Sequence, residues 1–264
     1  NELINGINEI NKVGGKIVQF FVNVTSKKSQ EKYKEVNALL KKLDMKCVIH
    51  ASYTINCSTN WNEHSWWIRQ FIREIDLACQ VGAIGIVIHL GKQISLSSEE
   101  ALNNMYTSLL YVHNHSNKNI KILIETSTGQ GSEICFLLDD LSYFYKKISK
   151  HNNEQIRDRF GICLDTCHIF SAGYDITTES AVKSYFNKFQ DMIGLEHIKL
   201  IHFNDSKNEM GTRLDRHANI GEGFIGKAGL ICIAKMFTRL EVPLILETPR
   251  DGQKIDFDLL SGSV

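Results

Sequence analysis

The chain has 264 residues, 43% of them hydrophobic, and its 30 Lys and Arg residues balance 30 Asp and Glu residues to a net charge of zero. This length suits one large α/β barrel or two small domains. The neutral balance excludes a global basic field for nucleic acid, although a locally basic groove remains compatible with it. The apolar runs are too short to cross a membrane, and seven cysteines without a CxxC pair do not indicate a disulfide framework. We therefore expect one domain over residues 1–264, monomeric and intracellular (cytoplasmic or nuclear) rather than secreted.

Short apolar, β-branched runs alternate along the chain with longer segments of helical period. The opening segment Asn1–Val13 has the pattern of a helix, as do Gln30–Leu43 and Trp67–Val81. The predicted strands are Lys16–Phe21, Cys47–Tyr53, Gly85–Leu90, Lys121–Thr126, Phe160–Thr166, Lys199–Asn204 and Pro243–Thr248. This alternation predicts βα units around a parallel sheet. Seven strands are one fewer than a TIM (β/α)8 barrel contains, and because a helix opens the chain we expect the first barrel strand to precede Asn1.

Six consecutive predicted strands end on a side chain that can bind a metal ion. These strand-end residues are His50, His89, Glu125, Asp165, His202 and Glu247. In a parallel barrel all carboxyl ends of the strands form one face, where catalytic residues of TIM barrels collect. Imidazoles and carboxylates gathered there suit Zn²⁺, Fe²⁺ or Mn²⁺. A bound cation would also relieve the repulsion between the three crowded carboxylates.

Three more ligand-type residues accompany this set. His168 lies three residues after Asp165, and Asp215 and His217 stand two apart in the glycine-rich segment 202–226. A turning backbone with this spacing can offer both Asp215 and His217 to one ion, and the glycines permit the unusual backbone angles of such a path. The other histidines lie in predicted helices or loops, where we expect them at the surface: His64, His113, His115, His151 and His197.

Several sequence blocks resemble the signature blocks of endonuclease IV. They are "VIHLG", "ILIETSTGQG", "CLDTCHIFSAGYD", "HFNDSK", "LDRHANIGEGFIG" and "LILETP". The resemblance covers nearly the whole chain from the predicted strand Lys16–Phe21 onward. It implies a zinc-dependent endonuclease on a TIM barrel that hydrolyses the phosphodiester 5′ to an abasic site in double-stranded DNA. The products would be a 3′-hydroxyl and a 5′-deoxyribose phosphate, as in base excision repair.

The resemblance also implies three Zn²⁺ ions, for which Mn²⁺ could substitute, and distributes the nine ligands among them. Glu125 would be the catalytic bridge between the first two ions, and water activated between these ions would attack the phosphate. The first ion would be completed by His50 and His89, the second by Asp165, His202 and Glu247, and the third by His168, Asp215 and His217. The third ion would stabilise the leaving 3′-oxygen.

The DNA-contacting loops depart from the family pattern. Thr54 stands where the family has leucine after the tyrosine, here Tyr53, and Thr25 stands where it has arginine. Because loops of this kind hold a flipped abasic nucleotide, we expect DNA recognition to depend on the remaining candidates. These candidates are Asn23, Tyr53, Lys27, Lys28 and Arg216.

Two other functions compete with a nuclease. A metal-dependent sugar isomerase or epimerase on the same barrel would need one or two ions and no third ligand set. A catalytically inactive DNA-binding relative would be expected to have lost ligands, whereas this chain retains all nine. Three zinc equivalents in the purified protein would favour the nuclease over the isomerase.

Overall fold

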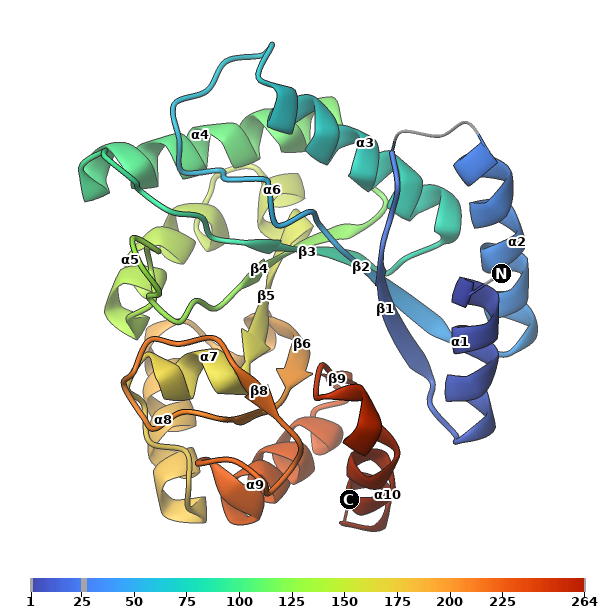
Figure 1. The fold of residues 1–264 in the computed structure, drawn as a ribbon. Helices are drawn as coiled ribbons and strands as arrows, with labels where there is room; N and C mark the ends of the chain where they lie inside the picture. The colour runs from blue at the N-terminus through green and yellow to red at the C-terminus, as the bar shows by residue number, and fades with distance from the viewer. Residues whose placement is uncertain (1, 25–27, 264) are drawn as a thin grey trace.

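Seven parallel strands line the centre of the computed structural model, which describes residues 2–24 and 28–263 (Figure 1). The strands are paired in the order β1-β2-β3-β4-β5-β6-β9. Their bounds are Ile17–Phe21 (β1), Lys46–His50 (β2), Gly85–His89 (β3), Lys121–Glu125 (β4), Phe160–Asp165 (β5), Ile198–Phe203 (β6) and Leu244–Leu246 (β9). Neighbouring strands are all parallel, as βα units require.

Most of the helices surround the strands on the outside of the arc, while the short α7 lies at the carboxyl end of β5 (Figure 1). The helices are α1 (Glu2–Lys12), α2 (Lys28–Lys42), α3 (Trp66–Val81), α4 (Ser98–His115), α5 (Leu138–Ser149), α6 (Glu154–Arg159), α7 (Thr166–Ser171), α8 (Glu179–Met192), α9 (Gly226–Arg239) and α10 (Gln253–Ser263). Local chemistry sets several ends. Ser97 and Glu100 form a capping box at the start of α4, and Gly82 ends α3 in the left-handed conformation at φ 80°. None of the described helices combines the length and apolar character that crossing a bilayer requires.

Two apolar layers hold the barrel together. The larger one packs the helices against the outside of the strands. The smaller one fills the barrel interior with one side chain from each strand: Ile17, Val48, Val87, Leu123, Cys163, Leu200 and Ile245. Because side chains two apart on a strand point the same way, the next inward position on each strand lies one level closer to the carboxyl face. Apolar residues therefore form a layer beneath a second, polar layer of side chains.

The predicted TIM barrel is confirmed, with all seven strands in their predicted places and a helix at the start of the described chain. Strand ends differ by a few residues. β2 ends at His50 rather than Tyr53, and β9 spans Leu244–Leu246 rather than Pro243–Thr248, because the backbone leaves the ladder where the polar layer begins. In the described part of the chain no ladder joins β1 to β9, as expected for a barrel that lacks one strand.

Candidate metal centre

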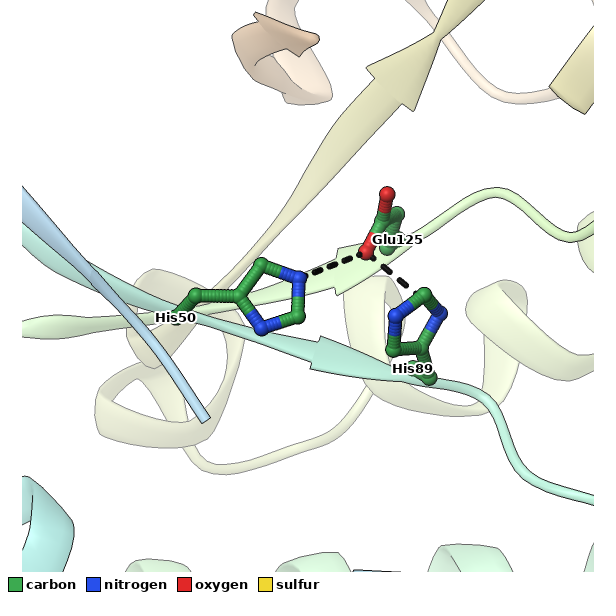
Figure 2. Close-up of side chains that lie close together, drawn as sticks. All are labelled: His50, His89 and Glu125. Atoms are coloured by element: carbon green, nitrogen blue, oxygen red, sulfur yellow. Dashed lines mark ion pairs between the residues drawn. The ribbon is translucent and has the colours of Figure 1, made fainter. Parts of the chain in front are cut away.

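Three ligand-type side chains from neighbouring strands meet at the carboxyl end of the barrel (Figure 2). His50, the last residue of β2, places Nε2 3.3 Å from Glu125 Oε2. His89, the last residue of β3, places Nδ1 3.5 Å from the same oxygen. Ligand atoms around a tetrahedral zinc ion are about 3.3 Å apart. The three side chains can therefore hold one cation between them.

Glu125 presents its other oxygen to a second group. Glu125 Oε1 lies 2.9 Å from His202 Nδ1, and Glu247 Oε2 lies 3.3 Å from the same nitrogen. Asp165 Oδ2 is 3.9 Å from it. Asp165 and His202 are completely buried on β5 and β6. Glu125 thus stands between two ligand groups, with one carboxylate oxygen toward each.

A third group adjoins the second. Asp215 Oδ2 lies 3.2 Å from His168 Nε2, and Asp215 Oδ1 lies 3.0 Å from His217 Nε2. His168 is placed by α7, which begins directly after β5, and His217 by a two-residue strand, β8 (His217–Ala218), paired with β7 (Asp205–Ser206). His217 Nε2 is also 3.7 Å from Asp165 Oδ2. The two groups therefore lie side by side at the barrel mouth.

Buried Asp205 anchors the segment 221–226, which directly follows the loop that brings Asp215 and His217 back over the mouth. Its carboxylate accepts hydrogen bonds from the backbone N–H groups of Gly221, Gly223, Ile225 and Gly226. A Cβ atom at Gly223 would lie 2.3 Å from the carbonyl oxygen of Ser206, so the backbone approaches too closely for any side chain. The glycine-rich sequence is thereby needed for the path of this loop.

Charges in the centre shift one another's pKa values strongly. Burial alone would lower the pKa values of His168 and His202, but neighbouring groups, Asp165 for the first and Cys163 and Glu125 for the second, raise both well above the usual value. Burial would raise the pKa of Glu125, yet its histidine neighbours hold it well below its usual range. Without a cation, protons on His168 and His202 therefore offset the charge of the buried carboxylates.

The third group behaves in the same way. Burial opposes the charge on His217, but Asp165 and Asp215 raise its pKa to about 9. The pKa of Asp215 is lowered, against its own desolvation, by the adjacent imidazoles of His168 and His217. A cation that entered this group would replace a proton on these imidazoles.

Three of the histidines use one ring nitrogen for a hydrogen bond to the backbone and direct the other ring nitrogen toward the carboxylates of the centre. The N–H groups donate to carbonyl oxygens in three pairs: His50 Nδ1 to Ala51 (2.8 Å), His168 Nδ1 to Thr126 (2.7 Å) and His217 Nδ1 to Glu247 (3.1 Å). The Nε2 atom of each is buried and has no hydrogen-bond partner among the described residues. Metal-bound histidines characteristically donate their second nitrogen to a carbonyl or carboxylate. The residues present therefore fit bound cations, and nitrogen with carboxylate oxygen is a donor set that suits zinc or manganese.

The strand-end pattern did not indicate two further polar residues that touch the centre. Gln19 in β1 donates from Nε2 to Glu247 Oε1 at 2.5 Å, and its Oε1 lies 2.8 Å from His202 Nε2. Asn204 donates from Nδ2 to Asp165 Oδ2 at 2.8 Å. In the sequence, Gln19 is the only polar residue in "IVQFF", two positions after an inward-facing isoleucine, and that was the available signal.

Two other residues qualify the expectations from the sequence. Cys167 lies close enough to Asp165 and His217 to be a ligand, but its thiol contacts the carbonyl oxygen of Arg216. Burial raises the pKa of this thiol to about 11, which disfavours the thiolate form that metals bind.

The expectation that His113 lies at the surface is wrong. This residue is buried because it falls on the inward stripe of α4, with its ring 6.3 Å from that of Phe160.

The predicted DNA-contacting residues lie around the same mouth as far as they are described. Tyr53 is 68% exposed, with its ring 5.0 Å from that of His50 and 5.3 Å from that of His89. Asn23 and Arg216 are exposed, and the Arg216 guanidinium donates to the carbonyl oxygen of Asp215. Lys27 lies outside the described residues, and for Lys28 only the backbone, at the start of α2, is described.

Comparison of the sequence with known proteins identifies the family of this chain. The family profile described as "Xylose isomerase-like TIM barrel" matches residues 7–260. A "Putative endonuclease 4" of Acanthamoeba polyphaga mimivirus is 34% identical over 252 residues, which are 91% of this chain and 80% of the relative. A "Probable endonuclease 4" of Mycoplasmopsis agalactiae is 37% identical over 239 residues, 89% of this chain and 81% of the relative.

The fold agrees with these sequence matches. Endonuclease IV from Thermus thermophilus superposes with a TM-score of 0.79 at 22% identity and covers 99% of this chain and 93% of its own. The chain belongs to the endonuclease IV family within the xylose isomerase-like TIM barrels.

Proposed function

We propose that this chain is an endonuclease that cuts DNA on the 5′ side of abasic sites, with three zinc ions held by its nine ligand-type side chains. The observation that carries the proposal is the third group, in which Asp215 shares its two oxygens between His168 and His217 beside the second group. The curated relatives named endonuclease 4 support the same activity.

Each ligand group would hold one cation. His50 and His89 would complete the first site with Glu125 as the bridge, because the two oxygens of Glu125 face different groups. Asp165, His202 and Glu247 would complete the second site. When bound, ions in such a cluster lower the pKa of water and offset charge on both the attacking and the leaving oxygen of a phosphodiester. Manganese would be a workable substitute, since it accepts the same donor types.

The surroundings of the site would receive the DNA. The pKa of Tyr53 is raised to about 12, by desolvation and by the nearby carboxylates Glu247 and Glu125, so its phenol stays protonated at neutral pH and can donate a hydrogen bond. Its exposed ring offers a face for the sugar or base beside the lesion. Asn23 and Arg216 would contact the backbone of the same strand, while Lys27 and Lys28 would add phosphate contacts.

A sugar isomerase on the same barrel is the weaker alternative. Isomerase chemistry needs a site of one or two ions, which the first two groups could supply. It leaves unexplained why the loop 205–217, which is closed by the pairing of β7 with β8, directs an aspartate at two histidines. In a nuclease, a third cation beside the first two would offset the charge that develops on the leaving oxygen.

The decisive experiment combines metal analysis with incision. Protein purified without added metal should contain about three zinc equivalents, and should cut a duplex with one tetrahydrofuran abasic analogue while leaving the intact duplex whole. The upstream product should be extended directly by a DNA polymerase, because incision on the 5′ side leaves a 3′-hydroxyl. A zinc-loaded protein that leaves the abasic duplex uncut, or a product that cannot be extended, would contradict the proposal.

A further inference from the structure

The polar layer at the mouth of the barrel contains a residue from a strand that supplies no ligand. On each of six strands the inward apolar residue is followed two positions later by a ligand-type side chain, as Val48 is followed by His50 and Leu200 by His202. On β1 the inward apolar residue is Ile17, and the residue two positions later is Gln19. Gln19 therefore occupies the ligand layer by register, although an amide is a poor ligand for zinc.

The two hydrogen bonds of Gln19 define which way its amide faces. A carboxylate accepts hydrogen bonds only, so the atom 2.5 Å from Glu247 Oε1 must be the amide nitrogen. The amide oxygen is then the atom 2.8 Å from His202 Nε2, and it can only accept, so that ring nitrogen must carry a hydrogen. Turning the amide around would set its oxygen against the oxygen of the Glu247 carboxylate, which is repulsive. The pair of contacts thus has one consistent arrangement.

This arrangement determines which atoms of the second group remain available. With its hydrogen on Nε2, His202 presents Nδ1 to the interior, where Glu125, Glu247 and Asp165 converge. With Oε1 held by the amide, Glu247 presents Oε2 to the same point. We propose that Gln19 is a positioning residue for the second cation, which fixes the tautomer of His202 and the rotation of the Glu247 carboxylate.

This role differs from the backbone anchoring of the neighbouring histidines. His50, His168 and His217 donate to carbonyl oxygens, which every residue type supplies. The His202 ring instead depends on one side chain from the opposite end of the sheet, 183 residues away in sequence. Outer partners of metal-bound histidines of this kind typically contribute 10–100-fold to metal affinity.

The test compares Gln19→Leu, which keeps the bulk but removes both hydrogen bonds, with Gln155→Leu, an exposed control on α6. Zinc binding is measured by competition with a chromophoric chelator, and the His202 tautomer by long-range ¹H–¹⁵N spectra of the zinc-loaded protein. Gln19→Leu should weaken one of the zinc equivalents by about 10–100-fold, leave the others unchanged and remove the Nε2–H pattern of one histidine. Excess zinc should restore most of its incision rate. Gln19→Met, of nearly the same shape, takes its place if the leucine variant does not fold.

A Gln19→Glu variant separates the two hydrogen bonds. Its carboxylate still accepts from His202 but repels Glu247, so the tautomer signature should persist while zinc affinity falls. Wild-type zinc affinity in Gln19→Leu, or in Gln19→Met where the leucine variant does not fold, would overturn the role of Gln19. The inference depends on the metal centre of the proposed function, but the two fail differently. A wild-type chain that binds zinc and does not cut abasic DNA contradicts the proposed function alone.

Discussion

Removing the Asp215 carboxylate isolates the contribution of the third ligand group. In Asp215→Ala, His168 and His217 lose contacts of 3.2 and 3.0 Å, while the first two groups keep every ligand. The backbone should stay in place, because Asp215 N–H donates to Gln130 Oε1 and does not use its own side chain. Loss of one preorganised charge stabiliser typically costs about 10²–10³ in rate, or roughly 3–4 kcal/mol of transition-state stabilisation.

Single-turnover incision of an abasic duplex measures this loss directly. The Asp215→Ala variant should be slower by at least that factor and should contain one zinc equivalent fewer, while its affinity for the duplex changes much less. Glu209→Ala, which removes an exposed carboxylate from the same loop, is the matched control and should retain wild-type zinc content and rate. Near-normal incision by Asp215→Ala would show that the third group is structural, and the proposed three-ion mechanism would be wrong.

Three further outcomes are expected. Asp205→Ala leaves the N–H groups of segment 221–226 without their acceptor, so urea unfolding should show a loss of about 2–4 kcal/mol, and a loss below 1 kcal/mol would contradict this anchoring role. Tyr53→Ala should raise KM for abasic duplex about tenfold with zinc content unchanged, and an unaltered KM would exclude Tyr53 from recognition. The pKa of His217 in the folded chain, about 9, lies above the unfolded value of 6.5. Its contribution, up to about 3 kcal/mol, is therefore complete below pH 6.5 and lost as the pH rises through 9. Chelator-treated protein should lose stability between pH 7 and pH 10 by this amount more than a His217→Gln variant, and equal losses in both would refute the assignment.

The sequence was sufficient to predict the strands and the side chains at their ends, because both follow from local patterns. A β-branched run that stops at His50 or Glu125 carries its own signal, and parallel pairing brings such ends together without further information. The loop with Asp215 and His217 was recognisable by its glycines. Cation binding by these residues stays a prediction that the metal analysis will decide.

The unpredicted contacts depend on residues far apart in sequence. Gln19 contacts His202 and Glu247 only because the sheet curves until its first and last strands face each other, and no short window of sequence contains that curvature. His113 was assigned to the surface because a histidine is polar, although its helical position shares the buried stripe with Leu109. The position of a side chain was predictable where a single strand or helix determines it. It was not predictable where the packing of two elements against each other determines it.

The anchoring of the histidines determines where this metal centre can vary between relatives. A carbonyl oxygen survives any substitution of its residue, so drift at Ala51 or Thr126 leaves the acceptors for His50 and His168 in place. The ring of His202 is more vulnerable, because the oxygen that accepts its Nε2–H hydrogen bond is lost when Gln19 is replaced by a residue without a side-chain acceptor. A substitution at position 19 could therefore change the affinity or the metal preference of the proposed second cation site between relatives while every ligand-type side chain stays the same.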